Sequence, residues 1–235
     1  MDRPVRPARV LQLRPAADLA LLLAGPVVDA ARGLLGARLV RERGGARVVG
    51  RIVEAEAYAG PEDRASHARS GPTARAATMF GPPGHAYVYG VYGMHICLNV
   101  VAGPSGQGAA ILLRSVEPLE GLLSMRAARL ARAVASRRAV AADPAAEAAR
   151  LARIPGDRLA AGPANLAAAF GVSLGEDGID LLDPVGSLRL EPTDAGEDLE
   201  VLATARVGVA YAGPDWADRP WRFVVAGTPA ARAPR

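Results

Sequence analysis

The sequence contains no lysine, since all 28 of its basic residues are arginines. No side chain can therefore supply the amine that Schiff-base catalysis requires, and only the α-amine of Met1 remains for it. Cysteine is nearly absent as well. The single Cys97 cannot form an internal disulfide and has no His–Asn pattern of a thiol nucleophile, so we expect a buried strand residue in a reducing cytoplasm.

Long apolar runs are also missing. The stretch Leu19–Val28 follows several arginines as a signal peptide would, but Asp18 precedes it and Pro26 breaks it. It is far shorter than the ~20 residues that span a bilayer, so we expect a short helix and no membrane contact. Three histidines and one distant cysteine give no metal spacing, and there is no phosphate-binding glycine loop, so we expect neither a metal nor a cofactor.

Charge is distributed unevenly along the chain, whose formal net charge is +4. Residues 1–52 hold ten arginines against four acids, whereas residues 173–200 hold nine acids against one arginine, Arg189. This pattern favours a basic face that binds a polyanion, although two solvated surfaces would give the same composition.

With 235 residues, half of them apolar, the chain is long enough for one large domain. We predict a single α+β domain over residues 16–229, in which helices surround a curved, mostly antiparallel sheet with a protruding β-hairpin. An arginine- and proline-rich N-terminal arm (1–15) is expected to be flexible, and a tail (230–235) is expected to be disordered. The patterns predict these elements: helices over 18–24, 27–36, 119–138, 144–153 and 164–170, a long loop over 60–83, and strands over 46–58, 86–93, 94–101, 109–116, 181–190, 201–210 and 221–225.

Two carboxylates and a ring alternate along the predicted strand 46–58. Alternate strand residues share a face, so Glu54, Glu56 and Tyr58 point the same way, with neighbouring side chains about 6.5–7 Å apart. Burial would raise the pKa of at least one of the two carboxyl groups. The pair could flank a glycosidic bond, or it could be a solvated strand face.

The segment Y-V-Y-G-V-Y-G-M-H (87–95) holds three of the five tyrosines of a chain that is only 4% aromatic. Tyr87 and Tyr89 share a strand face, and Tyr92 lies at a glycine-flanked tip. An exposed ring there can enter a base stack, and the others can stack on an extruded base. An ordinary edge hairpin with core tyrosines is the alternative.

Taken together, the chain resembles the 3-methyladenine (alkyladenine) DNA glycosylase family. The matching stretches are residues 51–67 (R-I-V-E-A-E-A-Y-A-G-P-E-D-R-A-S-H), 79–100 and 108–121, with weaker matches at 31–36, 162–166 and 206–209. The resemblance covers roughly residues 20–229, and the order and spacing of these motifs are highly specific.

The resemblance implies a role for individual residues. Glu56 matches the general base that activates water, and Arg114 matches a residue near this water and the sugar-phosphate. Three rings match the walls around the flipped purine, and Asn99 matches a floor residue that crowds the 2-amino group of guanine. Tyr92 matches the residue that fills the gap in the duplex, and Met94 and Arg114 are expected at the DNA with it. The three ring residues are Tyr58, His67 and Tyr89.

The implied function is base-excision repair on double-stranded DNA, by a monomer found in the cytoplasm at the nucleoid. The enzyme would flip an alkylated or deaminated purine, release it by hydrolysis and leave an abasic site. Because a coupled lyase needs an amine, the absent lysines predict a monofunctional enzyme. The family commonly has a basic residue at Asn165, so one phosphate contact is expected to be lost. A non-catalytic binder of damaged nucleic acid and a carbohydrate hydrolase using Glu54 and Glu56 remain as alternatives.

Overall fold

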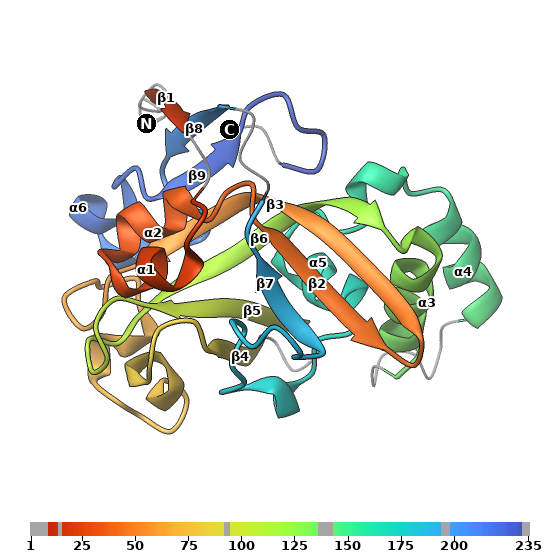
Figure 1. The fold of residues 1–235 in the computed structure, drawn as a ribbon, viewed down its shortest axis with the longest axis horizontal. Coiled ribbons are helices and arrows are strands. Elements are labelled where there is room, and N and C mark those ends of the chain that lie inside the picture. Colours follow the sequence, from red (N-terminus) through yellow and green to blue (C-terminus); the bar gives the residue numbers. More distant parts are fainter. Residues whose placement is uncertain (1–8, 14–15, 92–94, 136–142, 194–197, 232–235) are drawn as a thin grey trace.

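The computed structural model describes residues 9–13, 16–91, 95–135, 143–193 and 198–231. In this part of the chain, nine strands form one open antiparallel sheet in the order β1-β8-β9-β3-β6-β5-β4, and β2 pairs with both β3 and β7 (Figure 1). The strands are β1 (Arg9–Leu13), β2 (Arg38–Arg43), β3 (Ala46–Tyr58), β4 (Ala86–Val91), β5 (His95–Ala102), β6 (Ala109–Glu120), β7 (Leu188–Glu191), β8 (Leu199–Thr204) and β9 (Arg222–Val225).

Helices cover the sheet at both ends of its long strands (Figure 1). The α-helices are α1 (Leu19–Ala24), α2 (Val27–Gly33), α3 (Leu122–Ala135), α4 (Pro144–Ala152), α5 (Pro163–Ala169) and α6 (Pro214–Ala217). Asp18 caps α1, because its carboxylate accepts a hydrogen bond from the backbone N–H of Leu21 at 2.9 Å. The prediction of a single α+β domain with a largely antiparallel sheet is confirmed. No helix in the described ranges is long and apolar enough to cross a membrane.

The two faces of the sheet have different coverings. The main hydrophobic core joins α1, α2 and α5 to one face and includes Ala55, Ala57, Val100 and Ile111. On the opposite face, the segment 60–83 packs over β4, β5 and β6 through a smaller cluster that contains Tyr87. The sheet is therefore covered by helices on one face and by a loop-rich segment on the other.

This covering segment was predicted as a long loop, and it contains two short 3-10 helices, η1 (His67–Ser70) and η2 (Ala77–Phe80). The segment approaches the sheet closely at Gly108, which has a φ of +73°. A Cβ atom there would lie 2.6 Å from the ring of Phe80, so the contact requires glycine.

Several predictions from the sequence are wrong. Residues 9–13, expected in a flexible arm, form β1 and pair with β8. Only residues 188–190 of the predicted strand 181–190 lie in a strand, and β2 was not predicted. Ala230, expected in a disordered tail, is fully buried in the main core. β1 pairs with a strand far away in the sequence, which local patterns do not report, whereas β2 pairs with β3 across the short turn at Gly44 and Gly45.

The basic front and the acidic back of the sequence partly neutralise each other. Arg41 pairs with Glu176 at 2.5 Å, and Arg189 pairs with Glu42 at 2.9 Å. The contact between Arg189 and Glu42 follows from the pairing of β2 with β7. Part of the charge asymmetry is therefore internal, and it does not by itself create a basic face.

Candidate active site

The register of the sheet lines up polar residues on the face that the helices do not cover. Across the strands, Tyr87 of β4 is paired with Asn99 of β5, Asn99 with Leu112 of β6, and Leu112 with Glu56 of β3. Because directly paired residues point to the same side of a sheet, these four side chains form one continuous row across four strands. Tyr58 follows two positions after Glu56, so it belongs to the same face, as its alternation predicted.

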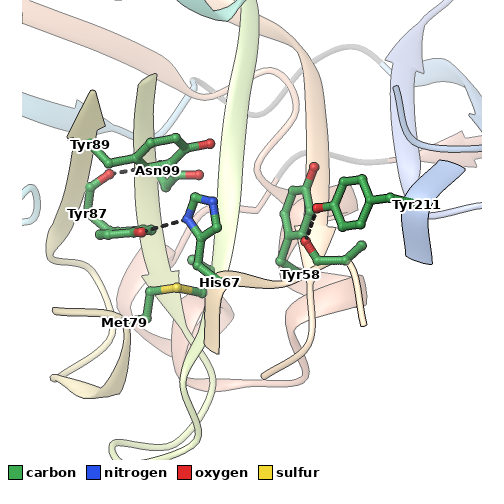
Figure 2. A pocket seen from close by; sticks show the side chains of 9 residues that line it. Tyr58, His67, Met79, Tyr87, Tyr89, Asn99 and Tyr211 are labelled. Atoms are coloured by element: carbon green, nitrogen blue, oxygen red, sulfur yellow. Dashed lines mark hydrogen bonds between the residues drawn. The ribbon is translucent and has the colours of Figure 1, made fainter. Parts of the chain in front are cut away.

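A pocket that opens to solvent lies on this face. Figure 2 shows Tyr87, Tyr89 and His67 on one side of it and Tyr58 and Tyr211 on the other. The lining consists of Tyr58, Ala65, His67, Met79, Tyr87, Tyr89, Asn99, Ala110 and Tyr211. The arrangement leaves a slot between aromatic walls, which is a shape suited to a flat ring.

One wall is a cluster of three rings. The ring of His67 lies edge-on to that of Tyr89 with centroids 4.6 Å apart, and the rings of Tyr87 and Tyr89 are 5.3 Å apart. A hydrogen bond of 2.8 Å joins Nδ1 of His67 to the hydroxyl of Tyr87. Asn99 donates from Nδ2 to the backbone carbonyl of Tyr87 at 2.9 Å. These bonds fix the orientation of the side chains around the slot.

Glu56 lies behind Tyr58 and is completely buried. The Tyr58 hydroxyl donates to its Oε2 at 2.9 Å, and the backbone N–H of Val207 donates to its Oε1 at 2.8 Å. A guanidinium nitrogen of Arg114 is 3.2 Å from the same Oε1. A carboxylate offers about four acceptor positions, so these three donors leave one for a water molecule.

Glu54, two residues earlier on β3, holds Arg114 in place. Its Oε1 accepts hydrogen bonds from Nε of Arg114 at 2.6 Å and from Nε of Arg222 at 2.7 Å, and its Oε2 accepts one from the hydroxyl of Ser115 at 2.9 Å. Burial raises the pKa of the Glu54 carboxyl, but the positive charges of Arg114 and Arg222 outweigh it, so the pKa lies below its ordinary value.

This result excludes the alternative of a solvated strand face, because both carboxylates are buried. At Glu54, two arginines compensate for desolvation, so the pKa of this carboxyl is not raised. Arg114 bridges the two carboxylates, so they do not repel each other as a bare pair would.

The outer wall at Tyr58 is supported by a buried ion pair. Arg206 and Asp63 are completely buried and form a two-pronged contact of 2.5 and 2.9 Å. The guanidinium carbon of Arg206 lies 4.7 Å from the centre of the Tyr58 ring and 5.1 Å from that of Trp221. Arg206 precedes Val207, whose N–H binds Glu56, so the pair positions both the ring and a donor.

Burial keeps the walls uncharged. It raises the pKa of Tyr87 to about 12 and that of Tyr58 and Tyr89 well above their ordinary value, so these phenols are neutral at pH 7. Burial, with the charges of Arg75 and Arg69, lowers the pKa of His67, so its imidazole is neutral as well.

The structure brings most of the residues singled out in the sequence to this one place. Four of them line the pocket, and Glu56 and Arg114 lie directly behind it. The four lining residues are Tyr58, His67, Tyr89 and Asn99. Tyr92 and Met94 lie outside the described residues, so their expected place at the DNA stays a prediction.

Sequence reasoning missed Met79, Tyr211, Asp63 and Arg222 as parts of the site. Met79 and Asp63 stand inside the recognised motifs, but neither has a residue type that signals this chemistry by itself. Tyr211 and Arg222 come from the C-terminal third of the chain. Arg222 reaches the site through the pairing of β9 with β3, and the Tyr211 hydroxyl donates to the backbone carbonyl of Ala65 at 3.0 Å. The weak match at 206–209 was the one signal for that region.

Asn165, where a basic residue was expected, has an arginine beside it. Nη2 of Arg129 donates to its side-chain oxygen at 2.9 Å, and the two residues line a polar hollow with Arg150 and Arg158. The positive charge that the sequence lacks at position 165 is therefore present next to it.

Comparison with known proteins agrees with this geometry. A putative 3-methyladenine DNA glycosylase of Anaeromyxobacter dehalogenans is 44% identical over 84% of this chain and 78% of its own length. One from Methanocella arvoryzae is 41% identical over 89% of this chain and 93% of its own length. The human DNA-3-methyladenine glycosylase is 43% identical over 87% of this chain and 64% of its own length. The model of the methylpurine-DNA glycosylase family matches residues 22–229, and the chain belongs to that family.

Proposed function

We propose that this chain, a DNA glycosylase that hydrolyses N-glycosyl bonds in base-excision repair, releases alkylated or deaminated purines from double-stranded DNA with Glu56 as the general base. The C1′–N9 bond of a purine cannot be reached in a stacked duplex, so the nucleotide is flipped out at a cost of a few kcal/mol. The flipped base enters the slot between Tyr58 on one side and His67 and Tyr89 on the other.

The observation that carries this proposal is the position of Glu56. Its buried carboxylate is hydrogen-bonded to the Tyr58 wall and has one acceptor position left over. A water molecule held there would pass its proton to Glu56 as its oxygen bonds to C1′. The C1′–N9 bond breaks with its electron pair leaving on the base, through an oxocarbenium-like sugar. Arg114, beside both carboxylates, fixes the direction of the Glu56 carboxylate.

The segment that follows β6 has a composition that suits binding to a polyanion. Residues 121–172, which include α3, α4 and α5, hold eight arginines against three acids. Arg129, Arg150 and Arg158 face the hollow beside Asn165. The N–H of Gly162 donates to the hydroxyl of Ser115 at 3.0 Å, and Ser115 donates to Glu54, so this hollow is joined to the active centre. Phosphates bound there would place a duplex beside the pocket without reading its sequence.

The absence of lysine supports a hydrolytic reaction with no lyase step. A glycosylase with lyase activity forms a Schiff base between an amine and C1′, and no side chain of this chain offers that amine. We infer that the product is an intact abasic site. Covalent trapping of the enzyme on damaged DNA with borohydride would contradict this inference.

The pocket and its catalytic groups all come from one chain, which supports a monomer as the working unit. Size-exclusion chromatography with light scattering, with and without a damaged duplex, measures this. A dimer that appears only with DNA would contradict it.

The glutamate proposal is tested by base release from duplexes that carry hypoxanthine or 7-methylguanine. Glu56→Gln keeps the size of the side chain and removes the base, so we expect release to fall by about 10²–10⁴-fold while duplex binding persists. The matched control is Glu62→Gln, at an exposed glutamate in the segment that follows β3. If the unaltered protein binds damaged DNA and frees no base, the chain is a non-catalytic binder. If it binds no DNA and cleaves a simple glycoside, the chain is a carbohydrate hydrolase.

A further inference from the structure

Every tyrosine whose ring lines the pocket, apart from Tyr87, has an arginine stacked on it. A guanidinium over an aromatic face within about 6 Å of the ring centre is attracted by the negative charge of that face. The distances from guanidinium carbon to ring centre are 4.7 Å for Arg206 and Tyr58, 5.1 Å for Arg75 and Tyr89, and 5.7 Å for Arg69 and Tyr211.

These three arginines stand outside the slot, since none of them lines it. Arg206 is buried behind Tyr58 and is neutralised by Asp63. Arg69 and Arg75 are exposed, and in the described structure they donate to the backbone carbonyls of residues 64 and 90 at 3.1 and 3.2 Å. Neither has a carboxylate partner among the described ion pairs.

The described charges around the slot have a positive sum. Three buried carboxylates are matched by three buried arginines, Arg69 and Arg75 add two positive charges, and Asp177, whose charge acts on Tyr87, offsets one of them. The matched pairs are formed by Glu54, Glu56 and Asp63 with Arg114, Arg222 and Arg206. The walls contribute no compensating negative charge, because the phenols of Tyr58, Tyr87 and Tyr89 stay protonated.

A base that enters the slot meets rings whose negative faces are already shared with guanidinium groups. A neutral purine loses little stacking energy from this, because its stacking depends on contact area and dispersion. A purine alkylated at N7 carries a positive charge, and this charge gains less from the shared rings and is repelled by Arg69 and Arg75.

We propose that Arg75 and Arg69 make this pocket select neutral purine lesions, such as deaminated bases, over permanently cationic ones. Cationic bases are still released, because they are good leaving groups, but the pocket does not attract their charge. The inference rests on the proposed glycosylase activity and names the class of substrate that its binding step favours.

The test compares neutral hypoxanthine with cationic 7-methylguanine, which share the 6-oxo purine frame and differ in charge and in the 2-amino group. The effect of the 2-amino group cancels when the ratio of a variant is compared with that of the unaltered protein. Single-turnover kcat/KM is measured on matched duplexes, after subtraction of spontaneous loss of 7-methylguanine. In Arg75→Gln, we expect the ratio of 7-methylguanine to hypoxanthine to rise about two- to fivefold over the unaltered protein, since the side chain is exposed and its field is partly screened. Arg69→Gln should raise it less, because its ring is at the pocket edge.

The matched control is Arg64→Gln, which removes an exposed charge from the same segment without a ring contact in the described structure. It is expected to weaken binding of both duplexes equally and leave the ratio unchanged. A ratio that stays constant or falls in both Arg75→Gln and Arg69→Gln would refute the proposal while leaving the glycosylase assignment intact. Release of neither base by the unaltered protein would refute the glycosylase assignment, and this inference with it.

Discussion

Replacing Asp63 by asparagine tests the importance of the buried ion pair behind the pocket. Asp63 is fully buried, and its two carboxylate oxygens accept four hydrogen bonds, two from Arg206 and one each from the backbone N–H groups of Ala59 and Ala65. Asparagine has the same shape but no charge, and its amide nitrogen cannot accept. One set of donors therefore loses its acceptor, and a buried guanidinium loses its counter-charge.

Removal of one partner of a buried pair costs about 3–5 kcal/mol. We expect the lower end, about 3 kcal/mol, because Arg206 keeps two other acceptors and its stacking. These acceptors are the backbone carbonyls of Ala57 at 2.9 Å and Trp216 at 3.2 Å. The loss is a large share of the roughly 5–15 kcal/mol that stabilises a typical domain.

Chemical denaturation of Asp63→Asn measures this loss directly, and thermal denaturation should show a Tm lower by about 6–12 °C for a chain of this size. The control Asp157→Asn changes an exposed carboxylate and should stay within about 0.5 kcal/mol of the unaltered protein. A loss below about 1 kcal/mol for Asp63→Asn would show that water reaches the pair and would refute the reasoning.

Two further predictions concern acid and salt. Because the pKa of Glu54 is lower in the folded protein than its ordinary 4.5, its share of the stability is complete above that value and is lost as the pH falls through the folded pKa. Urea unfolding between pH 7 and pH 3.5 should show this loss, and Glu54→Gln should flatten the slope; an equal slope in both proteins would contradict it. Arg158→Gln should weaken the binding of damaged and undamaged duplexes alike, and it should reduce the slope of log affinity against log salt concentration by about 0.9. An unchanged slope would show that the phosphates bind elsewhere.

Local patterns predicted the elements that carry the site. The alternation of apolar and polar residues located β3 with its bounds, and it placed Glu54, Glu56 and Tyr58 on one face. The hairpin of β4 and β5 was predicted as well, so that Tyr87 and Tyr89 were correctly placed on a common strand.

Features that depend on distant partners could not be predicted in this way. β1 is a strand because β8 offers it an edge, and Arg222 reaches Glu54 because β9 pairs with β3. The lowered pKa of Glu54 follows from two arginines that are 60 and 168 residues away. A local window of sequence does not include residues so far apart. The ionisation of the site was therefore harder to predict than the identity of its residues.

The loop-rich cover of the second face has a consequence for how this enzyme can change. Segment 60–83 supplies His67 and Met79 to the pocket, while the helices seal the separate core on the far side of the strands. New substitutions in that cover can alter the cavity without repacking the interior. Lesion preference can thus diverge among relatives while the scaffold keeps its stability.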